Sequence, residues 1–183
     1  MNKPLDLRFG KYEFLHWVEA QEGRFELKGG RVVMMTGGSK NHARVTSALV
    51  IALGSRLDRK LWAVTASDLA VEIGEDIRYP DVLVEPRDDK GAEHSTREPV
   101  LLVEVLSPSS LAVDLHDKPA EYLGLSSLEC YIVAAQDEPR VWVWQRAADG
   151  ARPFPDSAEK HEGIDATIPI RALGIDLPLA EIY

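Results

Sequence analysis

The chain has 183 residues, 45% hydrophobic and 28% charged, which predicts one domain over residues 1–183 and excludes intrinsic disorder. Its net charge of −9 excludes nucleic-acid binding by overall charge alone, and its single cysteine excludes an internal disulfide and a cysteine zinc cluster. Because no apolar run could span a membrane and the first residues lack the apolar core of a signal peptide, we expect a cytoplasmic protein without a membrane segment.

Apolar periodicity, turn residues and capping residues predict strands and a few helices along the chain. Gly29 and Gly30 join two extended runs and are typical of a hairpin turn, and Ser39 is placed to cap a helix. The first predicted elements are a helix over residues 12–20, hairpin strands over 24–28 and 31–35, a helix from 39 to about 59, and strands over 61–71 and 77–85. The others are a strand over 100–106, a helix over 114–123, strands over 130–135 and 140–146, a loop over 147–163 and a short tail over 175–179. This order predicts an α/β (α+β) fold in which helices flank a central mixed sheet.

Glu104 is the most informative residue because it lies inside an otherwise apolar strand. Successive residues of a strand face opposite sides of a sheet, so Glu104 shares one face with Leu102 and Leu106, whereas Val103 and Val105 share the other. Both faces are apolar, which predicts a central strand covered on both sides. An ionised carboxylate there needs a cation, hydrogen bonds or a metal ion. Alternatively, Glu104 lies at a strand end and reaches solvent or an arginine.

Asp81 follows Pro80 at a point where the strand over residues 77–85 begins or bends. If this strand neighbours the strand of Glu104, the two carboxylates converge. Two anions held close together repel unless one is protonated or a cation lies between them. Oxygen ligands favour Mg²⁺ or Mn²⁺. The alternative is that Asp81 only caps a turn.

The helix predicted over residues 114–123 places Asp114, Lys118 and Tyr122 at four-residue intervals, on one face. Lys118 could bring a cation to the two acids. The alternative is an exposed stripe with a weak ion pair. Pro119 is tolerated only in a first turn, which favours a helix that begins later than Asp114.

Taken together, Pro80-Asp81, the segment 104–109 and the spacing of Asp114, Lys118 and Tyr122 resemble the Uma-two family, within the PD-(D/E)XK superfamily of restriction-endonuclease-like proteins. The likeness extends over most of the chain. It implies a restriction-endonuclease-like fold and a homodimer that hydrolyses phosphodiester bonds in DNA with Mg²⁺ or Mn²⁺.

The resemblance also implies roles for single residues. Asp81 and Glu104 would be the metal-binding acids, and the main-chain carbonyl of Val105 would be a third ligand. The superfamily motif places a lysine two residues after the acid, where this chain has Leu106. The resemblance therefore gives that role to Lys118, whose flexible stem could reach the site from the following helix, with Asp114 and Tyr122 positioning it.

Glu26 and His42 are further candidates for the catalytic site. Glu26 alternates with apolar neighbours and could point into the site from the hairpin, or it could pair with Lys28 or Arg31. His42 lies near the start of a predicted helix, where a histidine is in most proteins a surface residue.

Two other functions stay open. The acidic balance and Leu106 fit a catalytically inactive nuclease fold that binds partners as a homo-oligomer. A hydrolase of a smaller phosphate ester would use the same acids.

Overall fold

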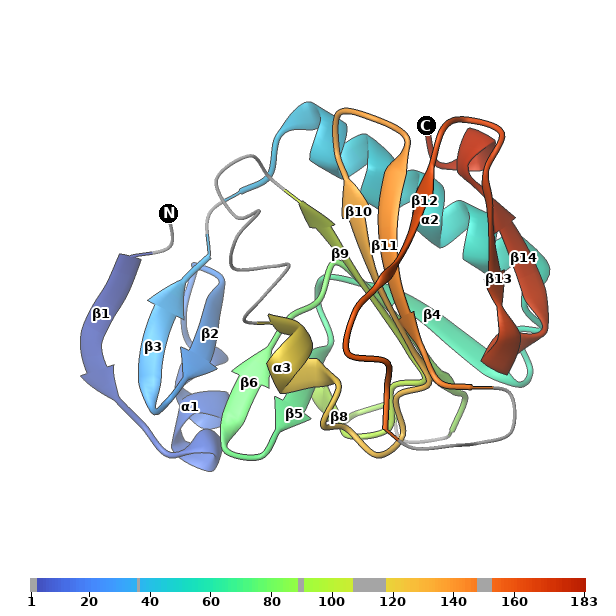
Figure 1. The fold of residues 1–183 in the computed structure, drawn as a ribbon. Helices are drawn as coiled ribbons and strands as arrows, with labels where there is room; N and C mark the ends of the chain where they lie inside the picture. Colours follow the sequence, from blue (N-terminus) through green and yellow to red (C-terminus); the bar gives the residue numbers. More distant parts are fainter. Residues whose placement is uncertain (1–2, 36, 89–90, 107–117, 148–152) are drawn as a thin grey trace.

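The computed structural model describes residues 3–35, 37–88, 91–106, 118–147 and 153–183. These residues form two six-stranded sheets, named A and B below, and one two-stranded sheet (Figure 1). Sheet A contains, from edge to edge, β1 (Lys3–Arg8), β3 (Arg31–Met34), β2 (Phe25–Lys28), β6 (Asp76–Arg78), β5 (Ala70–Ile73) and β8 (Ser95–Thr96). Sheet B contains β12 (Glu159–Glu162), β11 (Arg140–Gln145), β10 (Cys130–Ala135), β9 (Leu101–Leu106), β7 (Val82–Pro86) and β4 (Trp62–Ala66). The third sheet pairs β13 (Thr167–Ile170) with β14 (Ile175–Pro178).

A few helices complete the described fold. They are α1 (Lys11–Val18), α2 (Lys40–Arg56), α3 (Lys118–Tyr122) and the short 3-10 helices η2 (Arg171–Leu173) and η3 (Leu179–Glu181). In Figure 1, α2 runs behind the strands of sheet B, and α3 lies between the two large sheets. No helix among the described residues has the length and hydropathy needed to cross a membrane.

Local sequence explains the hairpin and the start of α2. Gly29 and Gly30 have φ values of 55° and 73°, a region that glycine adopts without steric cost, and they join β2 to β3 as predicted. The Ser39 hydroxyl accepts a hydrogen bond from the His42 amide at 3.1 Å and caps α2. The predicted hairpin and helix are therefore confirmed, although α2 ends at Arg56, before the predicted end.

Two predicted strands are wrong, because each is divided between the two large sheets. The segment 61–71 forms β4 in sheet B and β5 in sheet A, and the segment 77–85 forms β6 in sheet A and β7 in sheet B. Ser67, with φ of 56°, redirects the chain after β4. Pro80 lacks an amide hydrogen for a strand ladder and separates β6 from β7. The mixed α/β class is confirmed, but its strands fill two large sheets instead of one central sheet.

The prediction of a loop throughout residues 147–163 is also wrong, because β12 forms within that segment. It pairs with β11, with Arg140 opposite Glu162. All four residues of β12 are polar, so no apolar alternation marks it in the sequence. Pairing with a neighbouring strand, which composition does not reveal, makes this segment extended.

β9 is a central strand, with β10 parallel to it on one side and β7 antiparallel on the other. All six of its residues are buried. Leu101, Val103 and Val105 pack in a cluster with the apolar side chains of α2, whereas Leu102 and Leu106 pack in a second cluster on the other face. The predicted two-sided burial of the Glu104 strand is confirmed.

Candidate active site

The register of β7 and β9 brings the two predicted acids to the same end of sheet B. Val82 pairs with Val103 in this antiparallel ladder, so continuing the register by one residue sets Asp81 opposite Glu104. Residues opposite each other in such a ladder have Cβ atoms about 5 Å apart and point to the same face. The condition for their convergence, that the two strands are neighbours, is met by β7 and β9.

The Asp81 carboxylate is held by two groups from different elements. Its Oδ2 accepts a hydrogen bond of 2.8 Å from the Val105 amide and lies 3.1 Å from Nε2 of His42. His42 reaches Asp81 from the first turn of α2, which Ser39 caps. The structure therefore places His42 beside Asp81. The part of Val105 that contacts the Asp81 carboxylate is its main-chain amide. The predicted role of the Val105 carbonyl as a metal ligand stays a prediction.

The Glu104 side chain is buried, with 4% of its surface exposed. Its Oε1 accepts a hydrogen bond of 2.9 Å from the hydroxyl of Tyr122, which α3 carries. Burial, together with the negative charges of Glu104 and Glu26, raises the pKa of Tyr122 well above its ordinary value. Tyr122 consequently stays protonated, so that it donates to Glu104 and offsets part of the cost of burying that carboxylate.

Glu26 is buried on β2, and its described partners are Arg78 and Tyr79. Its Oε2 lies 3.1 Å from Nη1 of Arg78, and its Oε1 accepts a hydrogen bond of 3.2 Å from the Tyr79 amide. These contacts differ from the alternative pairing with Lys28 or Arg31. β2 and β6 are neighbours in sheet A, so the arginine comes from the adjacent strand, which spacing along the chain does not indicate.

The predicted trio of Asp114, Lys118 and Tyr122 is only partly within the described residues. Lys118 begins α3 and Tyr122 ends it, so these two share a helix, whereas Asp114 lies outside the described residues. Pro119 is the second residue of α3, in agreement with a helix that begins after Asp114. The side chain of Lys118 is outside the description, so its approach to the acids stays a prediction.

The donors at this end of sheet B suit a hard divalent cation. Asp81 and Glu104 offer carboxylate oxygens, and Asp81 Oδ1 accepts no hydrogen bond from a described residue. Among the described residues, no group of three histidine, cysteine or acidic side chains could hold a metal ion. The described residues therefore contribute a pair of carboxylates, and further ligands would be a main-chain carbonyl or water.

A family model described as "Putative restriction endonuclease", Uma2, matches residues 12–177 of the chain. The chain belongs to the Uma2 family. Two proteins of Synechocystis, each named "Uncharacterized protein", resemble it over 142 residues. One is 34% identical over 75% of this chain and 74% of the relative, and the other is 29% identical over 75% and 80%.

The fold of this Uma2 protein resembles a crystal structure from Anabaena variabilis described as "a putative nuclease belonging to DUF820". The two chains align with a TM-score of 0.75 over 95% of this chain and 97% of the other, at 17% sequence identity. At this identity the likeness supports the fold. The predicted family and nuclease-like fold are thus confirmed.

Sequence reasoning missed two residues of the Uma2 site region, Arg78 and Glu121. Arg78 is 3% exposed and bonds both Glu26 and Glu121, and Glu121 lies beside Tyr122 on α3. One signal was present: Arg78 stands in a mostly apolar segment, where a charged side chain needs a partner. Finding that partner required the fold.

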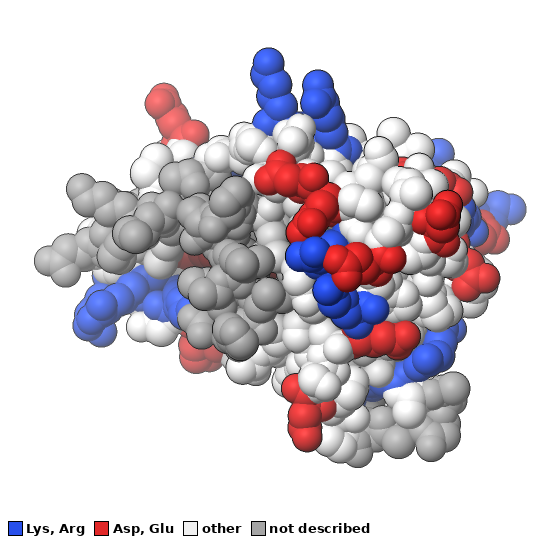
Figure 2. Space-filling model, turned by 45° about the horizontal axis from the view of Figure 1, so that its top comes forward, with Lys and Arg blue, Asp and Glu red and all other residues white. Residues whose placement is uncertain are grey.

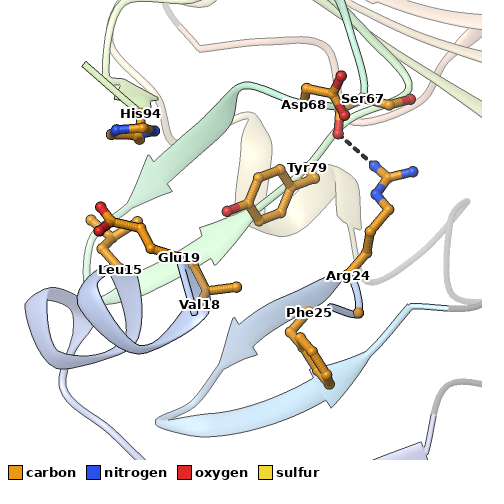
Figure 3. Close-up of a pocket in the computed structure, with 10 residues that line it drawn as sticks. Leu15, Val18, Glu19, Arg24, Phe25, Ser67, Asp68, Tyr79 and His94 are labelled. Atoms are coloured by element: carbon orange, nitrogen blue, oxygen red, sulfur yellow. Dashed lines mark hydrogen bonds between the residues drawn. The ribbon is translucent and has the colours of Figure 1, made fainter. Parts of the chain in front are cut away.

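A pocket of about 190 Å³ lies beside the Asp81 segment (Figure 3). Its lining includes Tyr79, Arg24 and Ser67; the Ser67 hydroxyl donates to the Asp81 carbonyl at 3.3 Å. In Figure 3 the Arg24 side chain extends to Ser67, whose carbonyl accepts its hydrogen bond. None of its described lining residues is a predicted site residue, so the pocket adjoins the Asp81 segment through Ser67 without containing either acid.

Charge on the face of the Uma2 protein in Figure 2 is mixed. Lysine and arginine side chains alternate with aspartate and glutamate side chains among the residues drawn in colour. The charge on this described surface therefore does not form a continuous basic region that would bind a polyanion. Recognition of a polyanion would rest on specific contacts and on a bound cation.

Proposed function

We propose that this Uma2 family member hydrolyses phosphodiester bonds in DNA with Mg²⁺ or Mn²⁺. The observation that carries the proposal is the β7–β9 register, which, continued one residue beyond the paired Val82 and Val103, sets Asp81 opposite Glu104 at one end of sheet B. Family membership and the fold shared with a protein described as "a putative nuclease" support a nuclease in place of a structural protein. A divalent cation between the acids would offset their repulsion and place positive charge where a phosphate would bind, although the net charge of −9 opposes DNA binding.

Individual residues of the chain would have separate roles in binding the ion and in positioning the acids. Asp81 and Glu104 would hold the ion, with the Val105 carbonyl as a third ligand. Once bound, a divalent ion lowers the pKa of a coordinated water and stabilises charge on the phosphate. His42 and the Val105 amide hold the Asp81 carboxylate in place, and Tyr122 does the same for Glu104.

Lys118 would supply the ammonium group that the superfamily motif places two residues after the acid. It stands at the start of α3, one helical turn before Tyr122. Its ammonium would bind a phosphate oxygen or orient the attacking water, and Asp114 would position it. A cut through both DNA strands needs two sites, so the proposal includes a homodimer.

Cleavage of supercoiled plasmid DNA under Mg²⁺ and under Mn²⁺ tests the proposal. We expect the wild type to nick the plasmid only with a divalent ion, and Asp81→Asn and Glu104→Gln each to lose at least about 100-fold in rate. Glu85→Gln is the matched control, because Glu85 lies on the same strand, β7, away from the end near Asp81. It should cleave like the wild type.

Two results would overturn the proposal. One is a wild type that leaves plasmid DNA intact under both ions, and the other is Asp81→Asn cleaving at the wild-type rate. A small phosphodiester, bis(p-nitrophenyl) phosphate, should be run in parallel. Hydrolysis of this ester without plasmid nicking would identify a hydrolase of smaller substrates.

A further inference from the structure

Arg78 is a buried arginine at the junction of the two large sheets. It ends β6, three residues before Asp81, and only 3% of its surface is exposed. Burial alone would lower the pKa of Arg78, but the carboxylates of Glu26 and Glu121 outweigh burial and raise it. Arg78 is therefore a permanent cation within a group of acids.

The guanidinium of Arg78 binds one acid from each side. Nη1 lies 3.1 Å from Oε2 of Glu26 on β2, and Nε donates to Oε2 of Glu121 on α3 at 3.0 Å. A second donor, Nη2, also reaches Glu121. The planar fork of an arginine fixes direction as well as distance, which an ammonium group cannot do.

Helix α3 depends on such contacts for its position. It has five residues, far below the roughly 12–15 at which an isolated helix becomes marginally stable. Tyr122 packs against Tyr131, with ring centroids 5.3 Å apart, and Glu121 is held by Arg78. The helical turn that places the Tyr122 hydroxyl on Glu104 is thus held in position through Glu121, the residue before Tyr122.

We propose that Arg78 is a positioning residue that clamps α3 to the strand leading into Asp81 and so sets Tyr122 against Glu104. This inference rests on the proposed function, because it assigns Arg78 a role in that reaction. Because Lys118 is the first residue of α3, the clamp also fixes the position of its main chain. Arg78 acts through these residues and contacts no reacting atom.

Arg78→Lys tests the clamp, because it keeps the charge and removes the fork. We expect kcat for plasmid nicking to fall roughly 10- to 100-fold, since small misplacements cost rate steeply. The KM for DNA and the Kd for Mn²⁺ should stay within about twofold, since the acids remain present. Glu121→Gln, which weakens one end of the clamp, should change kcat in the same direction by less.

Arg146→Lys is the matched control. Arg146 is also buried, but the described acceptors of its hydrogen bonds are the main-chain carbonyls of Leu128 and Leu125, and its described ion pair, with Glu129, is long at 3.8 Å. This variant should lose stability comparably while keeping the wild-type kcat. A loss of kcat that follows instability alone would appear in both variants and would overturn the proposal.

Amide hydrogen exchange gives a readout independent of activity. The Leu123 amide donates to the Pro119 carbonyl across α3 at 2.9 Å, so its exchange reports the docking of this helix. In Arg78→Lys it should exchange at least about 10-fold faster, whereas the Ile132 amide in β10 should not change. Unchanged Leu123 exchange, or an unchanged kcat, would overturn the clamp.

A wild type without any cleavage would refute the proposed function, and the exchange rates would still decide whether Arg78 holds α3.

Discussion

The two large sheets differ in the kinds of side chain that they bury. Sheet A buries three charged side chains on neighbouring strands, Glu26, Arg78 and Glu72, each with described ionic or hydrogen-bonding partners. In the described strands of sheet B the buried residues are apolar apart from Glu104. Sheet B therefore gains its stability mainly from apolar burial, whereas sheet A, which also has an apolar cluster, needs its buried charges to be satisfied as well. The candidate site lies where the two meet.

The largest effect should come from removing apolar volume in sheet B. Leu101 is fully buried in the centre of the sheet, so Leu101→Ala should lower the free energy of unfolding by about 2–5 kcal/mol. Urea unfolding monitored by circular dichroism measures this change. Leu61→Ala, at a side chain with 61% exposure, is the control and should change stability by less than about 0.5 kcal/mol. Equal effects of the two variants would contradict the dependence of sheet B on apolar burial.

A smaller loss should follow removal of one charge from sheet A. Glu26→Gln keeps the size of the side chain but takes away one of the two carboxylates that hold Arg78. We expect the free energy of unfolding to fall by about 2 kcal/mol, typical for a hydrogen bond to a charged group. Exposed Glu22→Gln should have almost no effect in the same urea titration. A Glu26→Gln protein as stable as the wild type would show that sheet A does not depend on this pair.

The smallest expected effect depends on pH and concerns Glu72. Burial would raise the pKa of Glu72, but hydrogen bonds from Ser95, Arg97 and Lys11 outweigh burial and hold the pKa below its ordinary value. The ionised form therefore stabilises the fold above the unfolded pKa of about 4.3, and this contribution disappears as pH falls through the lower folded pKa.

Glu72→Gln should consequently be less stable than the wild type by about 1 kcal/mol at pH 7. The difference should shrink as the pH is lowered below about 4. Urea unfolding of both proteins at pH 7, 5 and 3.5 measures it. A difference that stays constant over this range would show that ionisation of Glu72 does not contribute.

Much of the fold could be predicted from local patterns in the sequence. The glycine pair, the Ser39 cap and the apolar strand around Glu104 each act through neighbours in the chain, and each forms as predicted. The breaks at Ser67 and Pro80 were harder, because an apolar run does not show that its two halves join different sheets. β12 depends on a partner strand and had no local signal.

Some features of the candidate site could likewise be predicted from the sequence, and others could not. The convergence of Asp81 and Glu104 followed from strand alternation and an assumed pairing, which the β7–β9 register confirms. The contacts of Glu26 and Tyr122 did not follow, because they depend on how β6 and α3 lie across the sheets. A buried arginine such as Arg78 is recognisable in sequence only as a residue that needs a partner.

We propose that Asp81 and Glu104 together hold one divalent ion. A crystal soaked in Mn²⁺, with data collected at the manganese absorption edge, tests it most directly. We expect one anomalous peak within coordination distance of a carboxylate oxygen of each residue, and its loss in Asp81→Asn. A manganese ion bound away from either carboxylate, or no ion at this end of sheet B, would show that the two acids do not share an ion.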